Sequence, residues 1–147
     1  MTTSEIALVD SNILVYAAQT LSQFYLPAKR LRDKGIKGEL SLCVCPQVLK
    51  EFFAVITSPK KVTHPCTPGE AITEIKKYIE SKNIIKLSPR EDVLDRMITL
   101  LEKYETRQQL IFDVQLVATM LSNGVTKIYT YNQAHFAKFG EIEVLSP

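Results

Sequence analysis

Three carboxylates stand where the sequence predicts inward-facing or strand-end side chains. Asp10 interrupts the apolar run IALVDSNILVYA, Glu51 lies within CPQVLKEFFAVI, and Asp113 lies within LIFDVQLVATML. A buried carboxylate has to be paired, protonated or bound to a metal ion, because isolated burial of its charge is costly. No arginine or lysine in these segments shares the inward face. Carboxylate oxygens without a cationic partner suit Mg²⁺ or Mn²⁺.

Each acid also has a purely structural interpretation. Asp10 can cap the helix that follows it, because Asp, Ser and Asn are all good N-cap residues. Glu51 can lie at the edge of an apolar helix stripe, and Asp113 can compensate the dipole at a helix N-terminus. These interpretations stay open for each residue alone. Three such acids from distant segments are harder to explain separately than as one site.

The elements that must position these acids follow an α/β pattern. Short apolar runs alternate with longer segments of helical period, which predicts a mainly parallel, buried sheet. Ligands of such sheets bind beyond the carboxyl ends of the strands, where Asp10 would lie. The predicted strands are residues 6–9, 40–44, 84–87, 126–130 and 142–145.

Three helices have recognisable ends. TPGE at residues 67–70 and SPRE at residues 88–91 each match a capping box with proline at the first helical position. A helix over residues 114–121 should stop at the Asn-Gly pair of residues 123–124. The stripes that predict packing faces are Ile72, Ile75 and Ile79 after the first capping box, and Leu94, Met97, Ile98 and Leu101 after the second.

Composition predicts one compact domain over residues 1–147, with 46% hydrophobic and 23% charged residues. The net charge of +2 leaves no strong electrostatic footprint for nucleic acid or membrane. No apolar run approaches the roughly 20 residues that span a bilayer, and the start MTTSE lacks the basic region of a secretion signal. We therefore expect a cytoplasmic protein that is not bound to a membrane.

The cysteines raise a competing metal interpretation. Cys43, Cys45 and Cys66 are an odd number in a chain without a secretion signal, which predicts reduced thiols. Cys43 and Cys45 share one strand face, and His64 with Cys66 could complete a zinc site. The spacing matches no standard zinc ribbon, and strand cysteines are usually small buried hydrophobes. Phosphate-binding loops and dinucleotide fingerprints are absent from the sequence.

Taken together, the motifs resemble the PIN-domain nucleases, particularly the VapC-like toxins of prokaryotic toxin-antitoxin modules. The resemblance covers nearly the whole chain and is carried, in order, by VDSNILVYA, VLKEFFAVIT, IFDVQLVATML and IYTYNQAHFAKF. It implies a three-layer α/β/α fold with a mainly parallel central sheet. It also implies an endoribonuclease, in which one or two divalent ions activate water to attack an RNA phosphodiester. A small antitoxin partner and a homodimer are implied by the resemblance alone.

The resemblance assigns roles to matching positions of this chain. Asp10, Glu51 and Asp113 match the acids that bind metal, Thr130 and Asn132 match the closing motif, and Asn12 matches a polar position that orders the first acid. Asn132 is included among the catalytic residues, and Asn12, Thr130 and His135 are expected to support the site.

The chain departs from the family pattern in its last motif. Many relatives carry an aspartate where this chain has Asn132 or His135. Neither replacement is anionic like a carboxylate, so we expect a second metal to bind weakly or only with substrate. His135 also has a simpler interpretation as a capping or surface residue. The missing acid keeps an alternative function open, a catalytically weak module that binds RNA or a protein without cleavage.

Contacts with RNA are less visible in the sequence. Charges in loops are most often solvated, and aromatic residues near strand ends are ordinary packing. Phosphate contacts and base stacking nevertheless need such side chains. The candidates are Lys60, Lys61 and Arg107 for phosphates and Tyr131 for a base.

Overall fold

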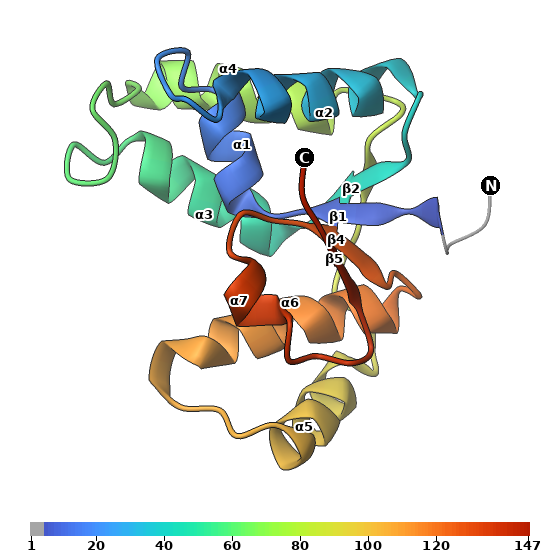
Figure 1. The fold of residues 1–147 in the computed structure, drawn as a ribbon. Helices are drawn as coiled ribbons and strands as arrows, with labels where there is room; N and C mark the ends of the chain where they lie inside the picture. The colour runs from blue at the N-terminus through green and yellow to red at the C-terminus, as the bar shows by residue number, and fades with distance from the viewer. Residues whose placement is uncertain (1–4) are drawn as a thin grey trace.

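The computed structural model describes residues 5–147 and contains a five-stranded parallel sheet between two layers of helices (Figure 1). The three-layer α/β/α fold is therefore confirmed. The strands are β1 (Ala7–Val9), β2 (Leu42–Val44), β3 (Ile85–Lys86), β4 (Lys127–Tyr129) and β5 (Glu143–Leu145). The helices are α1 (Ser11–Ala17), α2 (Tyr25–Lys37), α3 (Pro46–Ile56), α4 (Pro68–Ile79), α5 (Val93–Lys103), the 3₁₀ turn η2 (Gln108–Leu110), α6 (Ile111–Ser122) and α7 (Gln133–Phe136).

All five predicted strands are confirmed, each slightly shorter than the apolar run that predicted it. The strand order is β3-β2-β1-β4-β5, and every neighbouring pair is parallel. The chain moves outward from β1 to β3 and then returns to the other side of β1. Because parallel crossovers are right-handed, this reversal places α1–α4 on one face and α5–α7 on the other. The switch point of the sheet therefore lies between β1 and β4.

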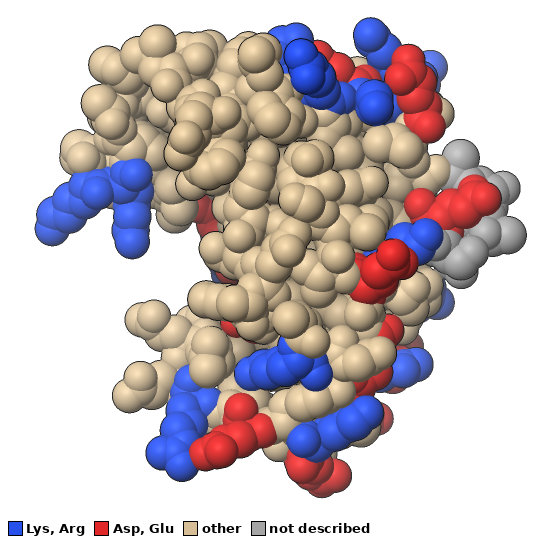
Figure 2. Space-filling model, viewed as in Figure 1, with Lys and Arg blue, Asp and Glu red and all other residues tan. Residues whose placement is uncertain are grey.

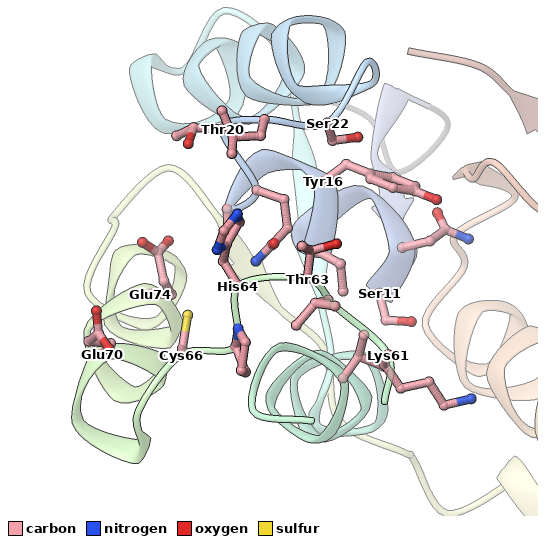
Figure 3. Close-up of a pocket in the computed structure, with 18 of the residues that line it drawn as sticks. Ser11, Tyr16, Thr20, Ser22, Lys61, Thr63, His64, Cys66, Glu70 and Glu74 are labelled. Atoms are coloured by element: carbon pink, nitrogen blue, oxygen red, sulfur yellow. The ribbon is translucent and has the colours of Figure 1, made fainter. Parts of the chain in front are cut away.

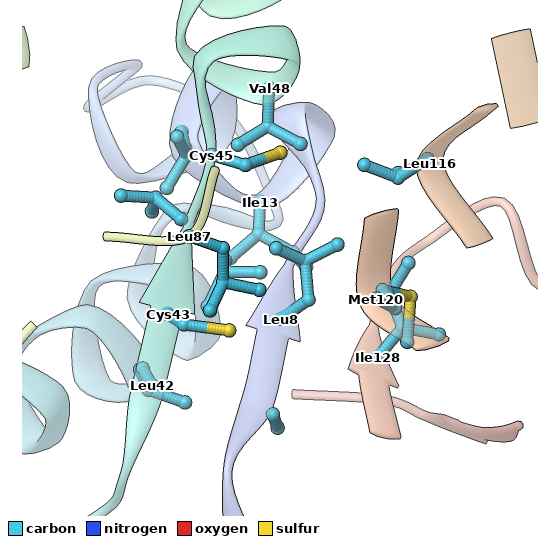
Figure 4. Packing of buried hydrophobic residues seen from close by; sticks show 14 of the residues in the cluster. Leu8, Ile13, Leu42, Cys43, Cys45, Val48, Leu87, Leu116, Met120 and Ile128 are labelled. Atoms are coloured by element: carbon cyan, nitrogen blue, oxygen red, sulfur yellow. The ribbon is translucent and has the colours of Figure 1, made fainter. Parts of the chain in front are cut away.

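The sheet is buried on both faces, which explains why its strands read as continuous apolar runs. Leu8 of β1, Cys43 of β2 and Ile128 of β4 have no exposed surface. Figure 4 shows Ile13 and Val48 on one side of these strands, with Leu116 and Met120 of α6 near β4. The central strands are consequently held rigidly from two sides, and the residues that follow them inherit fixed positions.

The helix ends follow the sequence in two of three cases. The Thr67 hydroxyl accepts from the backbone N–H of Glu70, and the Glu70 carboxylate accepts from that of Thr67, so the capping box of α4 is confirmed. Helix α6 stops at Ser122, and Gly124 takes a positive φ of 70°, as the Asn-Gly pair predicts.

The second predicted capping box, at residues 88–91, is wrong. Helix α5 begins at Val93, after a turn in which the Val93 N–H donates to the Arg90 carbonyl. The Leu87 N–H still donates to Val44, and the Ser88 carbonyl accepts from the Asn123 side chain. These contacts hold residues 87 and 88 in the line of β3, so the sheet overrides the local capping signal.

The predicted apolar stripes are only partly correct. In α4 the buried face carries Ala71 and Tyr78, whose ring packs edge-on against Phe52 of α3. In α5 the fully buried residue is Leu100, which lies on the side of α6. Helices α4 and α5 belong to opposite helix layers, and each buries a narrower stripe than its sequence predicts. Four predicted packing residues are exposed, namely Ile72, Ile79, Leu94 and Ile98.

No helix within residues 5–147 is long and apolar enough to cross a membrane. The expectation for the first residues, MTTSE, falls largely on residues 1–4, which lie outside the described part of the chain.

Candidate active site

The predicted acids reach one edge of the sheet by different routes. Asp10 directly follows β1, and its backbone N–H donates to the Tyr129 carbonyl of β4 at 3.0 Å. Helix α3 leaves the carboxyl end of β2 and carries Glu51 in its second turn. Helix α6 leads into the amino end of β4, so its first turn, which contains Asp113, lies back at the carboxyl edge. This edge is the switch point, where α/β folds bind ligands.

Asp10 is held at this edge by hydrogen bonds to both of its oxygens. Its Oδ1 accepts from the Ser11 N–H at 2.7 Å, which makes Asp10 the N-cap of α1. Its Oδ2 accepts from the Thr130 hydroxyl at 2.8 Å and from the Asn12 side chain at 3.2 Å. The residue is only 5% exposed. The structural and the functional interpretation of Asp10 therefore both fit the same side chain.

The closing motif is tied to the first motif by the same network. The Thr130 hydroxyl accepts from Asn12 Nδ2 at 3.2 Å and from the Asn132 N–H at 2.9 Å. Asn12 Oδ1 accepts from the Tyr131 N–H at 3.1 Å. Thr130 has no exposed surface, so a buried hydroxyl and an amide join segments 120 residues apart in sequence. The supporting positions expected for Asn12 and Thr130 thus lie against Asp10.

Glu51 is oriented by two residues that sequence reasoning missed. Its Oε2 accepts from the Ser11 hydroxyl at 3.2 Å, and its Oε1 accepts from Gln47 Nε2 at 3.2 Å. Gln47 also donates to the Phe112 carbonyl at 2.9 Å, which ties α3 to the start of α6. A signal existed for both: Ser11 adjoins the first acid, and Gln47 lies one helical turn before Glu51.

Asp113 has a different partner, His135 of α7. The distance between His135 Nδ1 and Asp113 Oδ2 is 3.3 Å, and the two side chains are 52% and 20% exposed. Asp113 lies in the first turn of α6, so the helix-dipole interpretation also fits it. The interpretation of His135 as only a capping or surface residue is incomplete, because its ring contacts a site acid.

Burial and the charges of neighbouring acids raise the pKa values of Asp10 and Asp113. Burial raises the pKa of Asp10, hydrogen bonds from Thr130 and Ser11 oppose the rise, and the charges of Glu51 and Asp113 add to it. Burial also raises the pKa of Asp113, whereas His135 and Lys138 lower it. Ionised together, the three carboxylates therefore repel one another in a poorly solvated place.

A divalent cation fits this donor set by charge and by chemistry. Within residues 5–147, no lysine or arginine lies within ion-pair distance of Asp10 or Glu51. The available donors are carboxylate oxygens, which Mg²⁺ and Mn²⁺ prefer. In the described part of the chain, however, no three His, Cys, Asp or Glu side chains are arranged to hold an ion as they stand. Water ligands, which Mg²⁺ retains in most protein sites, suit so open an arrangement.

Two of the three cysteines, Cys43 and Cys45, belong to the core. Cys43 and Cys45 are 0% and 1% exposed among apolar neighbours, as expected of small buried hydrophobes. Burial raises the pKa of both thiols, which favours the protonated form over the thiolate that binds zinc. Cys66 is partly exposed at the other end of the loop that follows α3.

A cavity of about 1030 Å³ adjoins the carboxylate network. It lies between α1, the loop of residues 61–66 and α4 (Figure 3). At the end nearest the site its lining includes Ser11, Asn12 and Asn132, and towards α4 it includes Glu70 and Glu74. Asn132 therefore lines open space beside the buried network, where it is accessible to a ligand.

The residues predicted to contact RNA differ in whether their side chains are already paired or packed within the protein. Lys61 extends from the loop after α3 on the side of the cavity where Ser11 lies (Figure 3). In Figure 2, Lys and Arg side chains project at this end of the molecule beside a hollow. Within the described residues neither Lys60 nor Lys61 has an ion pair, whereas Arg107 pairs with Glu105 at 2.6 Å. Tyr131 packs against Tyr16 and Phe24, with ring centroids 5.3 and 4.8 Å away, which favours its packing role.

Known proteins are similar to this chain in sequence along nearly its whole length. Ribonuclease VapC48 of Mycobacterium tuberculosis is 23% identical over 138 residues, which cover 94% of each chain. Ribonuclease VapC24 of the same organism is 26% identical over 139 residues, which cover 95% of this chain and 94% of that protein.

Two solved structures have the same fold. The crystal structure of Mycobacterium tuberculosis VapC20, described as a toxin that cleaves the sarcin-ricin loop, matches with a TM-score of 0.66 at 16% identity. It covers 93% of this chain and 98% of that one. The VapBC2 structure from Rickettsia felis, bound to a promoter DNA fragment, matches with a TM-score of 0.64 at 15% identity and covers 97% and 98% of the two chains.

The family model of the PIN domain matches residues 7–142, which include all three acids and the closing motif. This chain belongs to the PIN domain family.

Proposed function

We propose that this protein is a divalent-metal-dependent endoribonuclease that hydrolyses RNA phosphodiesters. The observation that carries the proposal is that Asp10, Glu51 and Asp113 lie at the same edge of the sheet, close enough for the charges of Glu51 and Asp113 to act on Asp10, without a lysine or arginine to neutralise Asp10 or Glu51. Relatives that span nearly the whole chain are named ribonucleases, which supports the same activity.

In this proposal the three acids hold Mg²⁺ or Mn²⁺, which when bound supplies an activated water and stabilises charge on the phosphate. Thr130 and Asn12 fix the carboxylate of Asp10, and Ser11 and Gln47 fix that of Glu51. Asn132 lines the cavity beside the acids and is positioned to donate to the substrate. Lys60 and Lys61 attract the RNA backbone, as loop lysines without an ion pair can.

We further propose that the enzyme is a cytoplasmic toxin inhibited by a small antitoxin. The solved relatives include VapBC assemblies and a toxin-antitoxin complex from Klebsiella pneumoniae. A homodimer remains a prediction, which light scattering of the purified protein would test.

The second candidate function is a module that binds RNA or a protein without cleaving it. Asn132 and His135 favour it, because neither supplies the additional negative charge that an aspartate would give. Cleavage assays separate the two candidates.

The first prediction is that cleavage of a mixed pool of structured and single-stranded RNA requires Mg²⁺ or Mn²⁺ and stops with EDTA. Asp10→Asn and Asp113→Asn should each lower the rate by about a hundredfold or more, because each removes an anionic metal ligand. Circular dichroism confirms that the variants are folded. A wild-type protein as inert as both variants with either metal would favour the binding module.

A further inference from the structure

We propose that His135 supplies a nitrogen ligand beside Asp113, so that the metal centre prefers Mn²⁺ and later transition metals over Mg²⁺. This inference rests on the proposed metal-dependent function. It concerns a position where the chain departs from the acid that many relatives carry.

The spacing of the two side chains is that of neighbouring ligands on one ion. Two donors bound at right angles, each about 2.1 Å from an ion, are about 3.0 Å apart. His135 Nδ1 and Asp113 Oδ2 are 3.3 Å apart. Only a small adjustment therefore separates the observed pair from a shared ion.

The pair is also available to an ion. Among residues 5–147, His135 is the only side chain in ion-pair contact with the Asp113 carboxylate, whereas both oxygens of Asp10 and of Glu51 already accept hydrogen bonds. The His135 side chain is half exposed, so its ring has room to turn. Its neighbour Phe136 is 2% exposed and anchors α7 in the core. The backbone is thus fixed while the imidazole remains adjustable.

Whether the ligand atom is oxygen or nitrogen decides which metal ions bind more tightly. Mg²⁺ favours oxygen ligands, whereas imidazole suits transition metals, whose affinity for such sites rises from Mn²⁺ through Fe²⁺ and Co²⁺ to Ni²⁺. A competing arrangement has His135 as an outer partner that only orients Asp113 by a hydrogen bond. The two arrangements differ in whether nitrogen touches the metal.

Metal binding to the purified protein, stripped of metal, distinguishes them without RNA. Isothermal titration with Mg²⁺, Mn²⁺ and Co²⁺ is performed on wild type, His135→Ala, His135→Asp and the control His64→Ala. His64 is the other histidine and is exposed in the loop after α3. We expect the ratio of Mg²⁺ to Co²⁺ dissociation constants to fall about tenfold or more in both His135 variants and to stay unchanged in the control.

Pulsed electron paramagnetic resonance of bound Mn²⁺ provides the direct readout. Wild type and His64→Ala should show a ¹⁴N coupling from imidazole that both His135 variants lack. Absence of this coupling in wild type, or an unchanged ratio in His135→Ala, would overturn the nitrogen ligand and leave the ribonuclease proposal standing. Failure of wild type to bind any of the three ions would overturn the metal centre as well.

Discussion

Thr130 shows how much of the candidate site depends on residues other than the three acids. Its buried hydroxyl donates to Asp10 and accepts from the Asn12 side chain and the Asn132 backbone. One small side chain therefore fixes an acid, an amide and the loop that leads to the cavity. Because buried polar groups depend on such complete networks, the loss of one member exposes the others to a desolvation penalty.

Thr130→Val should therefore cost about 1–3 kcal/mol of unfolding free energy, because it removes a donor from a buried carboxylate. It should also raise the pKa of Asp10 further, since the Thr130 hydrogen bond lowers that pKa. We expect cleavage to slow about tenfold or more. Denaturant unfolding and cleavage rates measure the two effects.

The matched control is Thr119→Val. Thr119 is also buried, but its hydroxyl donates to the Gln115 carbonyl within α6, away from the acids. It should leave cleavage near the wild-type rate. Equal loss of activity in both variants would assign the effect to general destabilisation.

The raised pKa of Asp10 gives a prediction for stability against pH. A carboxyl group with a higher pKa in the folded state binds more protons there than in the unfolded state. Ionised Asp10 therefore lowers stability progressively as pH rises from its unfolded pKa to its folded one, and the loss persists at higher pH. Without divalent ions, Asp10→Asn should raise Tm at pH 7, by about 2–4 °C for each kcal/mol of relieved penalty.

The gain in Tm of Asp10→Asn should shrink as the pH falls through the pKa that Asp10 has in the folded protein, because wild-type Asp10 then becomes neutral as well. Asp33→Asn is a control that should lower Tm at pH 7 rather than raise it, since Lys29 and Arg32 lower the pKa of Asp33. Thermal melts across pH measure both variants. A gain that does not vary with pH would refute burial of charge as the cause.

At the scale of elements, capping signals compete with the sheet. Two segments carry the same pattern of hydroxyl, proline and glutamate, but only the one before α4 forms a capping box. Residues 87 and 88 follow β3 and are held by Val44 and Asn123. Local chemistry alone cannot reveal such long-range contacts, and for the same reason it overestimated the buried stripes of both helices.

Thr67→Ala should cost about 1 kcal/mol of unfolding free energy, because it removes the hydroxyl that caps α4. Ser88→Ala should change stability far less, because Ser88 contributes a backbone carbonyl rather than a side-chain cap. Urea unfolding of the two variants measures the difference. Equal costs would contradict the observed start of α5.

At the scale of the whole molecule, the sequence predicted the parallel sheet because its strands are buried on both faces and read as apolar runs. It also predicted that Asp10 lies at the carboxyl end of the first strand. The pairing of that strand with β4, which brings Thr130 beside Asp10, came only from the structure. It did not predict the contacts of Ser11 and Gln47 with Glu51, or of His135 with Asp113. Those contacts depend on the angles between helices, which periodicity alone does not determine.

The placement of β4 beside β1 affects when the protein can first act during synthesis. Asp10, Glu51 and Asp113 all precede residue 127, where β4 begins, yet Thr130 completes the hold on Asp10. At the roughly 5–20 residues per second of typical synthesis, a growing chain carries all three acids for about one to three seconds before Thr130 is added. The hydrogen-bond network around Asp10 can therefore form only after residue 130 has been synthesised, and the proposed activity follows the synthesis of the acids with that delay.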